Sequence, residues 1–450
     1  MENVFFVGIN GIGMSGLAKI MKELNYNVAG SDPSSSYLTD EMRNQGIKIY
    51  SEHKRENIDN MDTLIVSTAI SRENPEYKRA VEEGIPVLKR GELLAKLLNE
   101  KTGVAVAGTH GKTTTSSMMA TVLLEKDPTI VVGGIVDSIK SNAKYGAGEY
   151  FVAEADESDN SFLYMRPKYS VITNIEADHL EKHGCLENIK KSFNIFMQQT
   201  EREVIVCKDN KNIQDLIGYK DNVVTYSLLD KAADIYAEGI KIKDGKTIYD
   251  VYIKGEYVGE FSLSIPGTHN VYNSLPVIYL AREFGLNMEK VKKEIAEFKG
   301  AKRRYDVLFD NGNIKVIDDY AHHPTEIEAT LQGARSIEKN HITVIFQPHR
   351  YSRLKFLLEE FAGTFKSADE LILMPVYSAG EKDEFGVSLE DLLNKIGHEN
   401  SRIVKDKDEL EKDLLSRKEN HVYMFMGAGS ISAIAHEFAE RLEKEKKGTF

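Results

Sequence analysis

A glycine-rich segment near the middle of the first half of the chain constrains the fold most. The short apolar run Val104 to Ala107 leads directly into Gly108-Thr109-His110-Gly111-Lys112-Thr113-Thr114, and a helix of small and apolar residues is expected to follow. Such a loop places backbone N–H groups, an ammonium and a hydroxyl at a helix N-terminus, where they can hold a polyphosphate and its Mg²⁺. The loop is a shortened P-loop, because only Thr109 and His110 separate its glycines. The alternative is a glycine-rich turn with an exposed lysine.

The whole chain alternates short apolar runs with amphipathic stretches, which predicts an α/β fold of parallel strands linked by helices. Its 450 residues suggest about three domains at roughly 150 residues each. The strand, glycine loop and helix pattern restarts after residues 100–103, and the basic run Lys299 to Arg304 precedes a further series of strands. We therefore expect domains at residues 1–100, 101–300 and 301–450.

The apolar runs predict the individual strands. In the first domain these are Val4–Val7, Asn27–Ala29, Thr63–Ser67 and Ile85–Leu88; in the second, Val104–Ala107, Tyr150–Ala153, Tyr169–Thr173 and Glu203–Cys207; in the third, Ile314–Ile317, Ile342–Phe346, Leu371–Met374 and Val422–Met426. The alternating segment Ala237 to Leu263 predicts antiparallel hairpins. Helical spacing in Asn273 to Phe284 includes Pro276, which predicts that this helix starts just before the proline.

Composition excludes several classes of protein. The net charge of −12, from 58 basic and 70 acidic residues, argues against a general binder of nucleic acid or of anionic membranes, so any anionic ligand must be held locally. No tract has the apolar length of a membrane span, and the first residues lack the basic and apolar regions of a signal peptide. Cys185 and Cys207 lack the spacing of metal ligands and fit a reducing compartment. We expect a cytoplasmic protein; its oligomeric state is not indicated.

A second glycine loop, Gly8 to Gly16, follows the first predicted strand. It could hold a phosphate, and its glycines are denser than the dinucleotide-binding fingerprint requires. Asp32, at the end of the next strand, could bind ribose hydroxyls, so a nicotinamide-dependent dehydrogenase and a purely structural turn are both open alternatives for this segment.

Acidic and histidine-containing segments follow two strands of the middle domain. Glu154-Ala155-Asp156-Glu157-Ser158-Asp159 comes after one of them, and Asn174-Ile175-Glu176-Ala177-Asp178-His179 after the other. The carboxyl ends of parallel strands meet at one edge of a sheet, where carboxylates can hold Mg²⁺ beside a phosphate loop. His179 can be a second metal ligand or a structural histidine.

Two polar segments follow strands of the last domain, Asp318 to Pro324 and Gln347 to Arg353. Their histidines, arginines and carboxylates suit an anionic or zwitterionic substrate, because arginine binds carboxylates bidentately. The paired histidines His322 and His323 have no further ligands at helical or strand spacing, so the sequence does not indicate a metal site there.

Taken together, these segments resemble the Mur ligase family, the ATP-dependent ligases of peptidoglycan precursor synthesis. The resemblance covers nearly the whole chain, and its most specific motifs, in the family's order, lie at 108–115, 154–159, 173–179, 268–273, 318–324 and 348–353. It implies an N-terminal Rossmann-like domain for a UDP-sugar, a central ATPase domain and a C-terminal Rossmann-like domain that closes over the site. The implied reaction activates the lactyl carboxylate of UDP-N-acetylmuramate with ATP, and the amine of L-alanine then attacks the acyl phosphate.

The resemblance also implies residue roles. The UDP-sugar site would comprise Gly11, Gly13, Met14, Ser15, Asp32, His53, Ser67, Thr68, Ala69 and Arg90. The nucleotide would contact Gly108, Thr109, His110, Gly111, Lys112, Thr113, Thr114, Asn270, Asn273, Arg304 and Asp319. Thr113 and Glu154 would hold one Mg²⁺, and His179 would ligate a second metal ion. Asp319, Tyr320, His322, His349, Arg350 and Arg353 would reach the amino acid and the reacting phosphate.

Deprotonation of the amine needs a base, and we expect His322 or His349 because imidazole titrates near neutrality. Asn194 stands where several relatives carry a carbamoylated lysine, so none is expected here. Within the family the rival is the ligase that recycles an intact tripeptide; Ser158 after the acidic pair favours addition of a single L-alanine. A regulatory P-loop switch is a third alternative, but it would not need acidic and histidine clusters from several domains.

Overall fold

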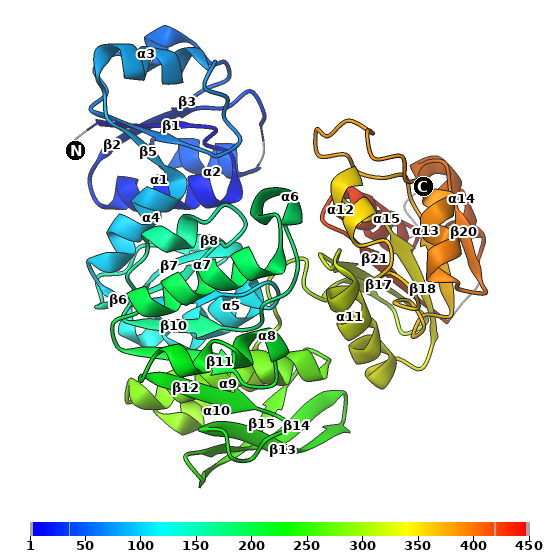
Figure 1. Ribbon diagram of the computed structural model, residues 1–450. Helices are drawn as coiled ribbons and strands as arrows, with labels where there is room; N and C mark the ends of the chain where they lie inside the picture. Colours follow the sequence, from blue (N-terminus) through cyan, green and yellow to red (C-terminus); the bar gives the residue numbers. More distant parts are fainter. Residues whose placement is uncertain (1–2, 36, 418–419, 447–450) are drawn as a thin grey trace.

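The computed structural model describes residues 3–35, 37–417 and 420–446. Its strands form three separate sheets, one in each successive part of the chain (Figure 1). The N-terminal sheet lies at the top of Figure 1, the central sheet below it, and the C-terminal sheet to one side. The predicted α/β class with three domains is confirmed.

The N-terminal sheet is entirely parallel, with strand order β3-β2-β1-β4-β5. Alternate residues of β1 enter different cores: Phe5 and Val7 pack on one side and Val4 and Phe6 on the other, because successive side chains of a strand point to opposite faces. The elements are β1 Asn3–Val7, α1 Ile12–Glu23, β2 Asn27–Ser31, α2 Tyr37–Asn44, β3 Lys48–Tyr50, η1 Arg55–Ile58, β4 Thr63–Val66, α3 Pro75–Glu83, β5 Val87–Lys89 and α4 Arg90–Asn99.

The central sheet has ten strands in the order β15-β14-β13-β12-β11-β10-β6-β9-β7-β8. Its interior pairs are parallel, whereas β8 at one edge and the β13-β14-β15 hairpins at the other are antiparallel, which confirms the predicted hairpins. The elements are β6 Thr102–Ala107, α5 Lys112–Val122, η2 Leu124–Lys126, β7 Thr129–Val136, β8 Ser141–Lys144, β9 Tyr150–Glu154, η3 Ser161–Tyr164, β10 Tyr169–Ile172, α6 Leu180–His183, α7 Leu186–Gln199, β11 Glu203–Cys207, α8 Lys211–Gln214, η4 Ile217–Tyr219, β12 Val223–Ser227, β13 Ile235–Lys243, β14 Lys246–Ile253, β15 Glu256–Leu263, α9 Thr268–Glu283 and α10 Met288–Glu297.

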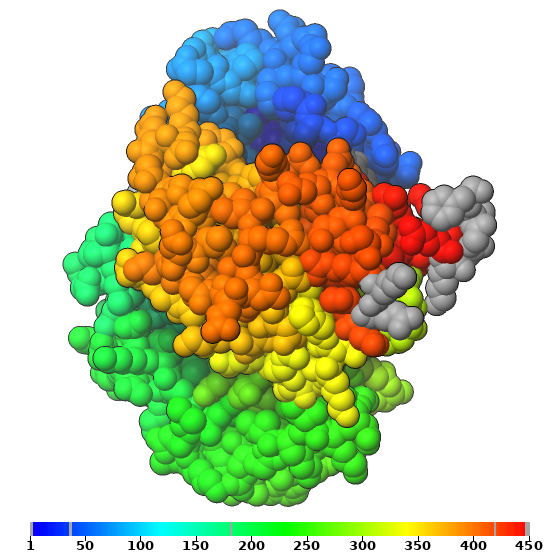
Figure 2. Space-filling model, turned by 90° about the vertical axis from the view of Figure 1, so that its right-hand side faces the viewer, coloured from blue at the N-terminus to red at the C-terminus, as the bar shows by residue number. Residues whose placement is uncertain are grey.

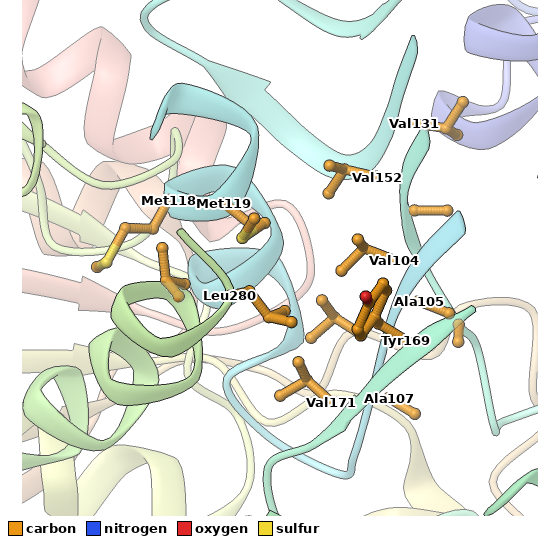
Figure 3. Packing of buried hydrophobic residues seen from close by; sticks show 14 of the residues in the cluster. Val104, Ala105, Ala107, Met118, Met119, Val131, Val152, Tyr169, Val171 and Leu280 are labelled. Atoms are coloured by element: carbon orange, nitrogen blue, oxygen red, sulfur yellow. The ribbon is translucent and has the colours of Figure 1, made fainter. Parts of the chain in front are cut away.

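Helices α5 and α9 pack against each other beside the central sheet. Figure 3 shows Met119 of α5 and Leu280 of α9 on the side of the helices that faces Val104 and Val171 of the strands, with Met118 on the opposite side of α5. The expectation that α9 begins just before Pro276 is wrong, because the helix begins at Thr268 and carries the proline inside. An interior proline removes a helix hydrogen bond at a cost of about 3 kcal/mol. The burial of almost every residue from Asn270 to Ala281 offsets that loss.

The C-terminal sheet has the order β16-β17-β21-β18-β19-β20 and is parallel apart from β16. Two apolar cores cover its faces; Met424 of β21, for example, enters one and Phe425 the other. The elements are β16 Asp306–Asp310, β17 Ile314–Asp319, α11 Pro324–Ile337, β18 His341–Phe346, α12 Tyr351–Phe356, β19 Glu370–Leu373, α13 Leu389–Ile396, β20 Ser401–Ile403, α14 Lys407–Ser416, β21 His421–Met426 and α15 Ile431–Lys446.

The domains contact one another in two different ways. The N-terminal domain shares an apolar core with the central domain, and α1 lies so close to β8 that a Cβ on Gly16 would be 2.9 Å from Cβ of Ala143. The C-terminal domain has its own cores, and polar side chains such as Arg353 and Asp178 join it to the central domain; Figure 2 shows it in front of the other two domains. Among the described residues, none of the helices combines the length and apolarity needed to cross a bilayer.

Candidate active site

The central glycine loop joins β6 to α5 in a conformation that requires glycine. Gly108 has φ +136° and Gly111 φ +83°, both in the left-handed region. A Cβ on Gly111 would also lie 2.5 Å from Oδ1 of Asn273. Helix α5 begins at Lys112 without a side-chain cap. Its N-terminal N–H groups and the positive end of its dipole therefore suit a phosphate.

Lys112 is held inside this loop. Its Nζ donates to the carbonyl oxygen of Gly108 at 2.5 Å and to Oε1 of Glu157 at 2.9 Å. Burial alone would lower the pKa of Lys112, but the carboxylates of Glu157 and Asp156 outweigh it and raise that pKa. The loop thus carries a fixed positive charge, while burial raises the pKa of Glu157.

The residues present fit a magnesium ion beside the loop. The hydroxyl of Thr113 donates to Oε1 of Glu154 at 2.5 Å, so a hydroxyl and a carboxylate from different elements meet where oxygen ligands are needed. His179 has different surroundings: it adopts φ +53° and lines a small pocket with Arg350 and Arg353. Thr113 and Glu154 therefore form one oxygen pair, and His179 stands at the boundary with the C-terminal domain.

A cleft of about 310 Å³ opens between the glycine loop, α9 and the C-terminal domain. It brings together many of the predicted nucleotide residues: His110, Gly111, Thr114, Asn270, Asn273, Arg304 and Asp319. The sequence analysis missed its remaining wall, which includes Cys207, Tyr226, Ile265, His269 and Tyr272. Cys207, Tyr226 and Ile265 lie in or beside ordinary strands, and no local motif marks them. His269 and Tyr272 lie inside the motif at 268–273, but the sequence analysis assigned no role to them.

Asp319 and Arg304 meet at the C-terminal side of the cleft. The backbone N–H groups of Tyr305 and Ala321 each donate to the Asp319 carboxylate at 2.8 Å. Burial raises the pKa of Asp319 to about 6, although Arg304 opposes the shift. The Arg304 guanidinium lies 5.0 Å from the centre of the Tyr320 ring. Anionic and cationic groups thus line the same wall.

An ionic cluster that the sequence analysis did not find joins the glycine loop to the C-terminal domain. His110 places Nε2 3.3 Å from Glu176 and Nδ1 3.2 Å from Glu326. Its ring centre lies 4.6 Å from that of His323, and the Thr325 hydroxyl donates to Glu176 at 2.9 Å. Burial would lower the pKa of His110, but Glu326 and Glu176 raise it to about 9. Positions so distant along the chain give no sequence signal.

The predicted amino-acid site is assembled from two loops of the C-terminal domain. The ring centres of His322 and His349 lie 6.0 Å apart, and the guanidinium of Arg353 lies 3.0 Å from Nδ1 of His349. Arg353 also reaches Asp178 of the central domain at 3.4 Å. Arg350 lies in the loop between β18 and α12, as His349 does, and has φ +67°.

The pKa values of these histidines differ from the sequence-based premise. Burial lowers the pKa of His322 to about 3, and the positive charge of Arg353 is the second largest cause of this shift. Burial and Arg353 lower the pKa of His349 to about 4. The premise that these imidazoles titrate near neutrality is therefore wrong for the unliganded protein, in which both are neutral at pH 7.

The N-terminal glycine loop is fixed by Asp32. One carboxylate oxygen of Asp32 accepts from the backbone N–H of Asn10 at 3.0 Å, and the other accepts from Ser34. A Cβ on Gly13 would lie 3.1 Å from the Arg90 guanidinium, so the loop packs against that side chain. Arg90 in turn lies 3.5 Å from Asp156, which links this loop to the acidic segment of the central domain.

The other residues predicted for the UDP-sugar site surround the same sheet edge. Met14 and Ser15 are buried in the first turn of α1. Ser67, Thr68 and Ala69 follow β4, and the Ala69 N–H donates to the Ser67 hydroxyl at 3.4 Å. Nδ1 of His53 lies 2.9 Å from the fully buried carboxylate of Glu76.

Family comparisons match all three parts of the chain. Residues 3–102 match the model described as Mur ligase family, catalytic domain; residues 106–281 match the Mur ligase middle domain; and residues 303–429 match the Mur ligase glutamate ligase domain.

Individual relatives match over almost the full length. UDP-N-acetylmuramate–L-alanine ligase of Fusobacterium nucleatum subsp. nucleatum is 55% identical over 98% of this chain and 97% of its own. The enzyme with that name from Aquifex aeolicus is 40% identical over 99% of both chains. The crystal structure of UDP-N-acetylmuramate-alanine ligase from Thermotoga maritima superposes with a TM-score of 0.84 at 34% identity, covering 99% of this chain and 100% of that one.

Proposed function

Since this chain belongs to the Mur ligase family, we propose that it joins L-alanine to the lactyl carboxylate of UDP-N-acetylmuramate, converting ATP to ADP and phosphate. The observation that carries the proposal is the full-length match to alanine ligases combined with a lysine-bearing glycine loop facing a cleft between domains. In this reaction ATP phosphorylates the carboxylate, the amine attacks the acyl phosphate, and phosphate leaves.

The central domain would bind ATP. The N–H groups of the glycine loop and the ammonium of Lys112 would hold the β- and γ-phosphates, and the cleft would hold the nucleoside between α9 and Asp319. Thr113 and Glu154 would hold Mg²⁺, and His179 a second ion; such ions supply positive charge that offsets the charge of the phosphates. Lys112 would exchange its contact with Glu157 for a contact with the transferred phosphoryl group.

The N-terminal domain would bind the UDP-sugar at its glycine loop. Gly11 and Gly13 let the backbone approach the diphosphate, and Arg90 beside them adds a cation. The contact between Arg90 and Asp156 places this cation next to the acidic segment of the central domain. The lactyl carboxylate, carried on the same substrate, would therefore be directed toward the γ-phosphate.

The C-terminal domain would bring L-alanine to the acyl phosphate. Arg350 and Arg353 carry the cations that suit the carboxylate of L-alanine and the oxygens of the phosphate. His322 and His349 beside them are neutral, which is the protonation state in which an imidazole can accept the ammonium proton of the attacking amine. Both reach the substrate only when the C-terminal domain is closed on the central one.

The proposal is tested by measuring ADP release from purified protein with Mg-ATP and UDP-N-acetylmuramate. L-alanine should drive steady turnover with one amide product per ADP, identified by its mass. The tripeptide L-Ala-D-Glu-meso-diaminopimelate should not. Turnover with the tripeptide alone would assign the chain to peptide recycling, and turnover with neither amine would refute the ligase assignment.

A further inference from the structure

We propose that His110, Glu176 and His323 form a binding site for a transition-metal ion, such as Zn²⁺, that bridges the central and C-terminal domains. Among the described residues, these three side chains form the one group whose potential ligand atoms all lie within 4.8 Å of one another. Nε2 of His110 is 3.3 Å from Oε2 of Glu176, and Nδ1 of His323 is 3.9 Å from the same oxygen. This site is separate from the oxygen pair of Thr113 and Glu154.

The ligand chemistry selects the class of metal. Two imidazoles and one carboxylate are a ligand set that Zn²⁺ and Co²⁺ prefer, whereas Mg²⁺ prefers oxygen ligands alone. Bonds of about 2.0 to 2.1 Å in a tetrahedral site place ligand atoms roughly 3.4 Å apart. The two separations from the Glu176 oxygen, 3.3 and 3.9 Å, lie within about half an ångström of that value, and the ligand atoms of the two histidines lie within 4.8 Å of each other, so rotation of side chains can supply the adjustment.

The surroundings of His110 complete the arrangement. Its Nδ1 lies 3.2 Å from Glu326, and a carboxylate accepts hydrogen bonds without donating them. Glu326 therefore holds a proton on Nδ1. The second proton of the charged ring is on Nε2 and faces Glu176, so a metal ion would displace that proton and bind the Nε2 lone pair. A carboxylate behind a ligating imidazole is the usual outer support of a zinc-bound histidine. Nε2 of His110 is also buried without a hydrogen-bond partner.

His323 is the ligand from the other domain. It is 4% exposed and stands at the N-terminus of α11, where Nδ1 accepts from the backbone N–H of Thr325 at 3.3 Å. That long hydrogen bond is the one contact that a metal ion would replace at this nitrogen. Because His110 and Glu176 belong to the central domain, a bound ion would hold the C-terminal domain in the closed position.

The test uses Co²⁺ as the probe on the full-length protein after removal of metals by a chelator. Co²⁺ in a tetrahedral nitrogen and oxygen site absorbs visible light, and we expect one equivalent to bind and Zn²⁺ to displace it. His323→Asn should weaken Co²⁺ binding at least tenfold. Asparagine is a good N-cap, so this substitution keeps the start of α11 while removing the imidazole. His398→Asn, at another C-terminal histidine whose ring nitrogens bond backbone carbonyls, is the matched control.

Two further variants locate the ion. Glu176→Gln should also lose the visible absorption, whereas His179→Asn should keep it. Loss of the signal in His179→Asn but not in His323→Asn would assign the ion to the magnesium site and overturn the proposal. Absence of any tetrahedral absorption in the wild-type protein would overturn it too. None of these outcomes depends on ligase activity, so they are independent of the proposed reaction.

Closure of the C-terminal domain on the central domain can be measured separately. Small-angle X-ray scattering should show a smaller radius of gyration when Zn²⁺ is added to the wild-type protein, and no change for His323→Asn. An equal decrease in both proteins would show that the ion acts elsewhere.

Discussion

Nδ1 of His110 in the phosphate loop lies 3.2 Å from a carboxylate oxygen of Glu326 in the C-terminal domain. The same carboxylate lies 3.5 Å from the Arg304 guanidinium and 3.4 Å from Nδ1 of His322. One buried acid therefore connects the nucleotide loop, the segment between the domains and the amino-acid site. Its charge is retained because these neighbours, His110 foremost, hold the pKa of Glu326 well below its usual range against the effect of burial.

This cluster predicts a pH dependence of stability. The pKa of His110 is raised from 6.5 to about 9, so its stabilisation is fully present below about pH 6.5 and is lost as pH rises through about 9. The free energy involved is roughly 3 kcal/mol, at 1.36 kcal/mol for each unit of pKa. Calorimetry should show the melting temperature of the wild-type protein falling between pH 7 and 9.5, with a weaker dependence in Glu326→Gln.

The control for this prediction is Glu328→Gln, at an exposed acid of the same helix. It should retain the full pH dependence. Identical profiles for Glu326→Gln and the wild type would contradict the assigned role of the carboxylate.

The second prediction concerns Lys112. Lys112→Met removes the ammonium that the glycine loop holds and should reduce kcat for ADP formation by about 100-fold or more, because electrostatic stabilisation dominates phosphoryl transfer. Lys126→Met, at an exposed lysine of the same domain, should leave kcat unchanged. The substitution leaves the buried carboxylate of Glu157 without its cation, so a circular dichroism melt should confirm that the variant is folded. A folded Lys112→Met protein with normal turnover would exclude the proposed phosphate contact.

The third prediction concerns the orientation of His53. The fully buried carboxylate of Glu76 accepts from the Ser31 hydroxyl at 2.7 Å and lies 2.9 Å from Nδ1 of His53, so the proton is held on Nδ1 and Nε2 is left for the UDP-sugar. Glu76→Gln should raise KM for UDP-N-acetylmuramate by about tenfold and change kcat by less than about twofold. KM for ATP should not move. Equal increases in both KM values would indicate general damage to the domain instead.

The fourth prediction separates the two candidate bases. His322→Ala or His349→Ala should lower kcat by about 10- to 100-fold for whichever histidine accepts the ammonium proton. Raising the pH should partly restore that variant, because more of the L-alanine is then already deprotonated. Unchanged turnover in both variants would exclude both histidines as the base.

Local sequence signals were sufficient for the phosphate loop and the strands around it. The conformation of this loop is predictable from Gly108, Gly111 and Lys112, because a strand, a left-handed turn and a helix N-terminus are all encoded within a few residues. The hairpins after residue 237 were also predictable, since alternating side chains and glycine turns specify them locally.

Tertiary packing decided what the sequence analysis missed. By local rules Pro276 predicts the start of a helix, yet α9 begins at Thr268 and continues past the proline because its residues are buried on both sides of it. His110, Glu176 and His323 meet only because three loops from two domains converge, so spacing along the chain could not bring them together. Burial and Arg353 also moved the pKa of His349 to about 4, which composition cannot show.

The central claim is that the carboxylate of UDP-N-acetylmuramate is phosphorylated before L-alanine attacks it. The direct test uses substrate labelled with ¹⁸O in the lactyl carboxylate, with mass spectrometry of both products. Each amide formed with L-alanine should release one phosphate that carries a single ¹⁸O atom, because the carboxylate oxygen leaves with the phosphoryl group. Amide formation with unlabelled phosphate, or labelled phosphate without an alanyl product, would contradict the account.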